Sequence, residues 1–447
     1  MSLSDLPGPV PDPVIARAST AAGASTASAL AEPVERVRAL WVTGVVLVNL
    51  GINAAFFGPL QVLLGQQAAH FDEGGKEAIL ALVTGCGAAV SLVANPLFGA
   101  FSDRTTSRHG RRVPWVLLGA ILGAVALVAL AGAPNVAAMT ALWCAVQAGA
   151  NGMYAAITAA VPDRVPVAQR GTVGGLAAMG QTVGILLGAV IAAVVAGNFA
   201  LGYWLCAAAL LAGVVLYLFK NDDEPLPPRE RKPFKLVPFL KGVGAFIWSF
   251  WVSPRKYPDF AWAWLTRLLV STGNHMVTLY LLFFLSDAVH LKETEGIDPA
   301  IGVLVLTGLY ALTVIVTSVL GGRLSDRMGK RKPLVIASSV IIAVASLILA
   351  FAPTWIGALT GAIVLGIGFG AYLAVDFALI TQVLPAALDR GKDLGVINIA
   401  NSLPQVLAPL IAYPLVTELG GYVSLYVAAA VIGLLGAVFV VKIKKVA

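Results

Sequence analysis

GAFSDRTTSRHGRRVPW, residues 99–115, places one acid and four arginines between two long apolar segments. A similar stretch, GGRLSDRMGKRKP, occupies residues 321–333. The chain as a whole is strongly apolar, with 58% hydrophobic and 12% charged residues over a length of 447, whereas soluble proteins have roughly 25% charged residues. This composition predicts an integral membrane protein whose charges are confined to a few loops.

The apolar segments are long enough to cross a membrane as helices. A bilayer core about 30 Å thick requires roughly 20 apolar residues per helix, and strands of a membrane barrel would alternate apolar and polar residues, which these segments do not. We expect twelve spans, at residues 40–64, 78–101, 113–133, 136–160, 172–197, 199–219, 260–285, 299–320, 333–352, 355–384, 394–417 and 421–441.

The two halves of the chain repeat one pattern. Arg170-Gly171 recurs as Arg390-Gly391, and Asp103-Arg104 recurs as Asp326-Arg327 at nearly the same offset. The polar segment KNDDEPLPPRERKPFK at 220–235 separates the halves. The predicted fold is an all-α membrane protein with twelve transmembrane helices in two pseudo-symmetric six-helix bundles, and repeated bundles are typical of transporters with a site between the halves. The predicted parts are a disordered cytoplasmic tail (1–39), the N-terminal bundle (40–219), a cytoplasmic linker (220–258) and the C-terminal bundle (259–447).

The net charge of +7 reports membrane topology. When the N-terminus is placed inside, nearly every Lys and Arg falls in a tail or in a loop on the same side, and basic residues flanking spans mark the cytoplasmic side. We therefore expect both termini to be cytoplasmic and expect no nucleic-acid partner. The richness in Ala and Gly is typical of a bacterial source, which predicts a multi-pass protein of the plasma (inner) membrane, and we expect a monomer.

The two charged loops carry a motif. Its first copy is formed by Gly99, Asp103, Arg104, Gly110, Arg111 and Arg112, and its second by Gly322, Asp326, Arg327, Gly329, Lys330 and Arg331. This pattern resembles the loop G-x-x-x-D-R-x-G-R-R/K of the major facilitator superfamily. The insertion TTSRH in the first copy resembles the longer form in glycoside–pentoside–hexuronide cation symporters and sucrose–proton symporters. The resemblance implies alternating-access transport, a sugar substrate, and a central cavity lined by the first, fourth, seventh and tenth helices.

We interpret both motif copies as gating elements. An aspartate at a helix end can pair with arginines and with helix N-terminal amides, which would hold neighbouring cytoplasmic helix ends in one access state. The alternative is that these basic residues serve only as a topology signal.

Ionisable groups inside predicted spans are candidates for function. Asp376 and Arg267 lie at similar heights, each about 12 Å from a proline at the inner end of its helix, so an ion pair between them is possible. We predict that Asp376 takes up the coupled proton, with Arg267 and His275 as further candidates. Alternatives are a permanent structural ion pair, an Arg267 side chain that reaches the membrane surface, and a His275 that only packs. Melibiose-type symporters place acids in their second and fourth helices, whereas the corresponding predicted spans here have none, so sodium coupling is not favoured.

Polar and aromatic side chains recur at helical spacing on the four expected cavity helices. Amides, hydroxyls and aromatic rings can bind a neutral sugar, while the alternative is hydrogen bonding between helices. The predicted substrate-binding residues are Asn49, Asn53, Phe56, Gln147, Asn151, Tyr154, Thr158, Ser271, Asn274, Thr278 and Tyr372. On the fifth span, Gly180, Gly184 and Gly188 predict a close approach to a neighbouring helix.

The predicted function is a secondary active transporter, taking up a sugar or glycoside with protons. The sequence contains neither a phosphate-binding G-x-x-x-x-G-K-[ST] loop nor a G-x-S-x-G nucleophile motif, nor a cluster of metal ligands, so we expect no enzyme activity, no cofactor and no metal. Alternatives are a proton-coupled exporter of drugs or metabolites, which a more apolar cavity would favour, and a non-transporting membrane receptor or scaffold.

Overall fold

The computed structural model describes residues 33, 35–195, 197–219, 258–328, 331–382 and 390–444. These residues form helices joined by short loops, with no strand in the described ranges. The predicted tail and linker lie almost wholly outside the described residues.

Within the described residues, each of the twelve predicted spans coincides with a helical segment. The first half consists of α2 (Ala39–Gly58) continued by the π-helix η1 (Pro59–Leu63) and α3 (Leu64–Phe71), then α4 (Lys76–Ser102), α5 (Val113–Leu130), α6 (Val136–Arg164), α7 (Val167–Val194) and α8 (Phe199–Phe219). The second half consists of α10 (Pro258–Leu279) continued by α11 (Leu281–Phe283) and the π-helix η3 (Phe284–Ala288), then α12 (Leu291–Glu295), α13 (Pro299–Met328), α14 (Lys332–Phe351), α15 (Trp355–Gln382), α16 (Arg390–Thr417) and α17 (Gly421–Val441). In the described residues, nine helices are long and apolar enough to cross a membrane, and α10 with η3 forms a tenth that is bent by 43°.

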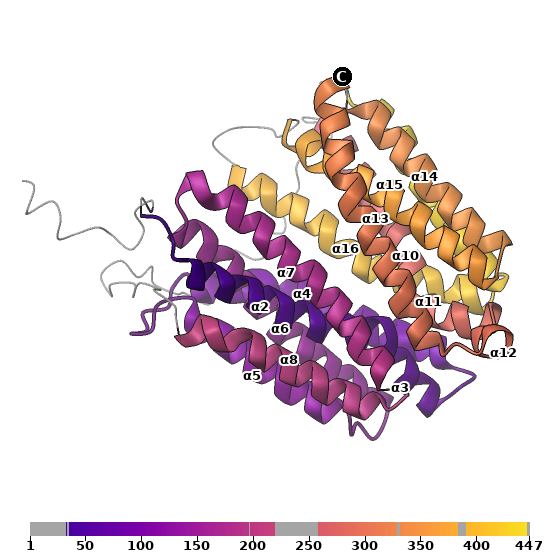
Figure 1. The fold of residues 1–447 in the computed structure, drawn as a ribbon, viewed down its shortest axis with the longest axis horizontal. Helices are drawn as coiled ribbons and strands as arrows, with labels where there is room; N and C mark the ends of the chain where they lie inside the picture. The colour runs from indigo at the N-terminus through magenta and orange to yellow at the C-terminus, as the bar shows by residue number, and fades with distance from the viewer. Residues whose placement is uncertain are drawn as a thin grey trace, which may run out of the picture.

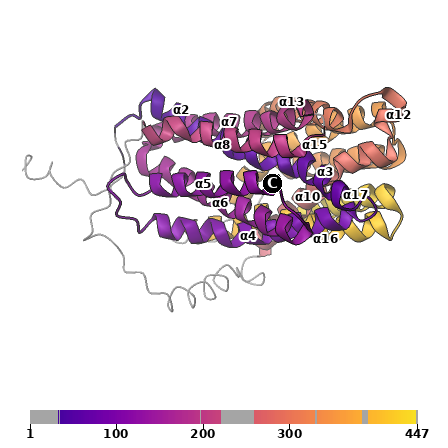
Figure 2. The same ribbon diagram turned by 90° about the horizontal axis from the view of Figure 1, so that it is seen from below.

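The helices form two bundles that meet along one side (Figure 1). The first contains α2 to α8 and the second contains α10 to α17, with α16 packed on α4 and α13 on α7 where the bundles meet. In Figure 2 the long helices run along a common direction. Figure 1 shows the bundles closest where α3, α11 and α12 lie, and we call this the outer end, following the predicted topology.

Helix α7 lies close to α2 because glycines remove the side chains between them. A Cβ on Gly180 would lie 2.5 Å from the carbonyl oxygen of Val46, and one on Gly184 would overlap the carbonyl oxygen of Leu50. A Cβ on Gly188 would lie 2.7 Å from the amide nitrogen of Gly58 on α2. The predicted close approach of the fifth span to a neighbouring helix is therefore confirmed.

Two π-helical turns occur at corresponding places in the two halves. Both η1 and η3 lie near the outer end, one in the first span of its half and the other in the seventh span of the chain. A π-turn changes which helix face points inward and often marks a functional site. Gln61 within η1 and Leu281 beside η3 both reach the space between the bundles.

Candidate functional site

A cavity of about 360 Å³ lies between the two bundles, with walls from both halves. Its first-half wall comes from α2, η1, α4, α6 and α7, and its second-half wall from α10, α11, α13, α14, α15 and α16. Most of the lining side chains are apolar, including Phe56, Phe57 and Phe369. The polar lining residues are Gln61, Thr84, Gln147, Thr182, Asn274, His275, Thr278, Thr307, Tyr310 and Gln405. In the described part of the chain no Asp, Glu, Lys or Arg lines this cavity.

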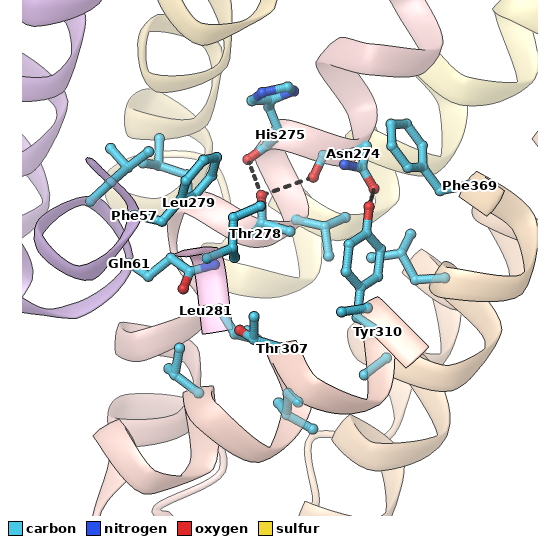
Figure 3. A pocket seen from close by; sticks show the side chains of 18 of the residues that line it. Phe57, Gln61, Asn274, His275, Thr278, Leu279, Leu281, Thr307, Tyr310 and Phe369 are labelled. Atoms are coloured by element: carbon cyan, nitrogen blue, oxygen red, sulfur yellow. Dashed lines mark hydrogen bonds between the residues drawn. The ribbon is translucent and has the colours of Figure 1, made fainter. Parts of the chain in front are cut away.

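Part of the polar wall is already hydrogen bonded within the protein (Figure 3). The hydroxyl of Tyr310 donates to Asn274 Oδ1 at 3.3 Å, which joins α13 to α10. The hydroxyl of Thr278 donates to the backbone oxygens of Asn274 and His275 at 3.2 and 3.3 Å. By contrast, Gln61 Oε1 is buried without a hydrogen-bond partner in the described residues. The cavity therefore combines apolar walls with a few polar atoms that can bind a solute.

Of the predicted substrate-binding residues, four line the cavity, namely Phe56, Gln147, Asn274 and Thr278, as does His275. Others turn toward neighbouring helices. Asn53 Nδ2 donates to the Tyr154 hydroxyl at 3.1 Å, and Gln181 Nε2 donates to Asn49 Oδ1 at 3.2 Å.

These contacts join α2 to α6 and α7. They agree with the alternative to substrate binding, in which such polar side chains form hydrogen bonds between helices. Asn151 donates to Gln147 Oε1 at 3.2 Å, Ser271 is buried, and Thr158 is exposed. None of these three, nor Asn49, Asn53, Tyr154 or Tyr372, lines the cavity in this structure. Helical spacing predicts that these residues share a helix face with residues that line the cavity. In the structure, their polar atoms either form hydrogen bonds within or between helices or lie away from the cavity.

Arg267 and Asp376 form an ion pair inside the C-terminal bundle. Arg267 Nη1 lies 2.6 Å from Asp376 Oδ2, and the Tyr372 hydroxyl donates to Asp376 Oδ1 at 2.6 Å. Both carboxylate oxygens are thus engaged, and the residue is only 5% exposed. The guanidinium reaches the carboxylate and not the membrane surface. Neither charged residue lines the cavity, and a proton-carrying role for Asp376 stays a prediction.

At the inner end of the first bundle, the motif arginines gather around two acids. Arg112 contacts Asp103 Oδ1 through Nη1 at 2.7 Å and Asp163 Oδ2 through Nε at 2.8 Å. Arg111 contacts Asp163 Oδ1 at 2.6 Å. Burial alone would lower the pKa of Arg112, but the carboxylates of Asp163 and Asp103 raise that pKa above its ordinary value. These contacts tie the α4–α5 loop to the end of α6.

Asp163 is a residue that the sequence analysis missed. We expected no acid in the fourth span, but α6 runs to Arg164 and carries Asp163 in its last turn. Its sequence signal was weak because Asp163 follows a proline at the predicted loop boundary. Among the remaining motif residues of the first copy, Gly99 lies in α4, Arg104 Nη1 donates to the Ala100 oxygen at 2.7 Å, and Gly110 has a φ of +88° in the loop.

The second motif copy is only partly described. Asp326 and Arg327 lie in the last turns of α13, and Arg331 directly precedes α14. Gly329 and Lys330 lie outside the described residues. The predicted gating role of this copy therefore stays a prediction.

A further polar cluster joins the two bundles at the outer end. Lys76 Nζ on α4 lies 2.8 Å from Asp287 Oδ1 on η3, and the Tyr422 hydroxyl donates to Asp287 Oδ2 at 2.9 Å. The Tyr280 hydroxyl donates to the Glu77 backbone oxygen at 3.3 Å. Sequence analysis did not identify this contact. Two of these contacts, Lys76 with Asp287 and Tyr280 with the Glu77 backbone oxygen, join the two bundles at the outer end.

The chain is similar to a known protein family and to several solved structures. The sequence profile of the Major Facilitator Superfamily matches residues 46–307 and 290–446. The chain belongs to the major facilitator superfamily. A curated relative, the multidrug resistance protein MdtL of Klebsiella pneumoniae (strain 342), is 38% identical over 92 residues, which span 21% of this chain and 23% of that protein. The matched stretch therefore spans less than a quarter of that relative's length.

Solved structures share the fold at low identity. A POT family transporter in complex with a thioalcohol-conjugated peptide aligns with a TM-score of 0.72 at 13% identity, over 90% of this chain and 96% of that one. The nucleoside transporter NupG aligns with a TM-score of 0.71 at 14% identity, over 91% and 100% of the two chains. A bacterial homologue of the human lysosomal transporter Spinster, inward-facing and unoccupied, aligns with a TM-score of 0.64 at 17% identity, over 90% and 94%. At this level of identity, these likenesses show a shared fold.

Proposed function

We propose that this transporter moves a neutral, partly apolar small solute with several hydroxyl groups, and that glycosides with an apolar aglycone are its substrate class. The observation that carries the proposal is the composition of the cavity between the bundles. Its lining has three phenylalanines, three amide side chains of glutamine, one asparagine and several hydroxyls, with no charged side chain in the described part.

A charged solute would lose much of its hydration in such a cavity without gaining a counter-charge, and that loss is costly. A free sugar would satisfy the amides but leave the apolar walls in contact with its hydroxyls. A glycoside matches both, because its sugar ring can hydrogen bond and stack while its aglycone contacts apolar side chains. The volume of about 360 Å³ lies within the usual range of small-molecule sites, about 300–1,000 Å³.

We further propose that transport is coupled to protons through Asp376. The Asp376 carboxylate is buried in contact with Arg267 and Tyr372, and loss of a neighbouring positive charge favours the neutral form of a carboxyl group. Movement of α10 relative to α15 during the access change would remove the Arg267 contact and favour protonation. The energetic coupling is then the competition between a proton and the guanidinium for one carboxylate.

Export of lipophilic compounds is the second candidate. The apolar walls favour it, as does the short stretch of 38% identity to a multidrug resistance protein. An exporter of lipophilic cations would be expected to offer an acid to its substrate, whereas the described cavity lining contains none. Neutral lipophilic compounds remain compatible with these walls.

The test is solute flux in proteoliposomes with an imposed pH gradient. The panel contains sucrose, maltose, an aryl glucoside and the lipophilic cation tetraphenylphosphonium. We expect the aryl glucoside to accumulate and tetraphenylphosphonium not to move. Transport of the cation without any glycoside would overturn the proposal in favour of export.

The proton step is tested separately with Asp376→Asn. We expect this variant to lose gradient-driven accumulation of the glucoside while downhill exchange continues. If accumulation persists in the variant, the carboxylate is a structural partner of Arg267 and the coupling site lies elsewhere.

A further inference from the structure

The hydrogen-bond partner of His275 Nδ1 shows whether this ring nitrogen donates or accepts. His275 Nδ1 lies 2.8 Å from the backbone oxygen of Ser271, one helical turn earlier on α10. A carbonyl oxygen can only accept a hydrogen bond, so Nδ1 must carry a hydrogen and donate it. The hydrogen of a neutral ring is then used up, and Nε2 is left as an acceptor with a free lone pair.

The surroundings of His275 favour the neutral ring. The residue lines the cavity, and in the described part of the chain this cavity has no carboxylate that could balance an imidazolium. The acid of α15, Asp376, is engaged by Arg267 and Tyr372 and does not line the cavity. An uncompensated charge there would be costly, so burial selects the uncharged form.

Other polar atoms that line the cavity have different hydrogen-bond partners. The hydroxyls of Thr278 and Tyr310 donate to oxygens on α10. Gln61 Oε1, across the cavity on η1, is buried and has no hydrogen-bond partner in the described residues. Both residues that carry these acceptors, His275 on α10 and Gln61 on η1, line the cavity, and they belong to opposite bundles.

We propose that His275 is a specificity-determining residue whose Nε2 accepts a hydrogen bond from a hydroxyl of the transported solute. This inference rests on the proposed function and deepens it, because it selects solutes by a donor at one position. A solute with an ether or a hydrogen in place of that hydroxyl leaves a buried acceptor unpaired, and such a loss discriminates strongly between similar molecules. His275 is then part of the binding site and has no role as a proton carrier.

The first measurement is nitrogen-15 NMR of the full chain in nanodiscs with labelled histidine. The chain has four histidines, and the His275 signals are assigned by their absence in His275→Gln. We expect Nδ1 to be protonated and Nε2 unprotonated without solute, and the Nε2 signal to shift when an aryl glucoside binds. A ring protonated on Nε2, or on both nitrogens, would overturn the inference.

The second measurement is a cycle that pairs protein variants with solute analogues. His275→Leu removes the acceptor, His275→Gln keeps an amide oxygen near the Nε2 position, and His70→Gln serves as a control at an exposed site outside the cavity. Affinities are measured for the glucoside and for its monodeoxy derivatives. We expect His275→Leu to weaken binding of the glucoside about 2- to 10-fold, and to leave unchanged the affinity for one particular deoxy derivative.

The outcomes separate this inference from the proposed function. If the wild type binds glucoside but every deoxy derivative is weakened equally in wild type and His275→Leu, the function stands and the inference is overturned. If no glycoside binds the wild type, the proposed substrate class fails, and the inference fails with it. Partial recovery of affinity in His275→Gln, with His70→Gln unchanged, supports an acceptor at Nε2.

Discussion

Arg267 Nη1 and Asp376 Oδ2 lie 2.6 Å apart in the C-terminal bundle, with side chains that are 12% and 7% exposed. Removing one partner of such a pair leaves a buried charge without compensation, which costs about 3–5 kcal/mol. Replacing both partners with apolar residues of similar size can be nearly neutral.

We therefore expect Arg267→Met to lower stability by about 3–5 kcal/mol and the double variant Arg267→Met, Asp376→Leu to recover most of it. Thermal unfolding in detergent measures this. The double variant should nevertheless fail to accumulate solute against a gradient. A double variant as unstable as the single one would show that the pair is not an isolated unit.

The pair between Lys76 and Asp287 joins the bundles at the outer end, with 9% and 29% of the side chains exposed. We expect Asp287→Asn to weaken closure by about 1 kcal/mol, roughly a fivefold change in the equilibrium between access states. Double electron–electron resonance between spin labels at Gly74 and Glu295, in a cysteine-free background, would report longer outer-end distances.

Glu73 provides a matched control for this prediction. It also contacts Lys76 at 2.8 Å, but it belongs to the same bundle and is 74% exposed. Glu73→Gln should leave the distance distribution unchanged, and exchanging the charges as Lys76→Asp with Asp287→Lys should restore closure. Equal effects of Glu73→Gln and Asp287→Asn would argue against a gating role for the pair.

The inner cluster predicts unequal effects for two aspartates. Asp163 is 18% exposed and contacts both Arg111 and Arg112, while Asp103 is 59% exposed and contacts Arg112. We expect Asp163→Asn to lower the free energy of unfolding by about 2–3 kcal/mol, and Asp103→Asn by less than about 1 kcal/mol. Chemical denaturation in detergent distinguishes them, and a larger effect at Asp103 would contradict the assignment.

The pH dependence of this cluster follows from Arg112. A raised pKa in the folded state gives stability that is present below the unfolded pKa and is lost only above the folded pKa. The fold raises the pKa of Arg112 above its ordinary value, because the carboxylates of Asp163 and Asp103 favour the charged guanidinium. The difference in unfolding free energy between wild type and Arg112→Gln should therefore stay constant from about pH 7 to 10, and a decline over that range would show that another group titrates.

Two glycines on α7 predict opposite effects of the same substitution. A Cβ on Gly184 would overlap the backbone oxygen of Leu50, whereas a Cβ on Gly174 would meet no atom within 4 Å. Gly184→Ala should lower stability by about 1–3 kcal/mol, because the helices must separate. Gly174→Ala should raise it by up to about 1 kcal/mol, because alanine favours a helix. Similar melting temperatures for the two variants would rule out the proposed packing.

The sequence by itself determined the twelve spans, the repeat and the superfamily. These depend on properties that are local in the chain: continuous apolar runs, basic loops and the spacing of a short motif. The glycines of the fifth span also predicted their close contact, since small residues at a spacing of four form one smooth helix face. Few ionisable residues lie inside the predicted spans, and for that reason the sequence could suggest an ion pair between Arg267 and Asp376.

Only the tertiary structure decided which polar side chains reach the cavity. Asn49 and Asn53 share a stripe with Phe56, but their amides contact neighbouring helices, because the rotation of α2 within the bundle sets the direction of each side chain. Tyr310 on α13 reaches the cavity, although the eighth span was not expected to contribute. Contacts between distant segments, such as Arg112 with Asp163 and Lys76 with Asp287, depend on how whole helices pack, and no local pattern records that.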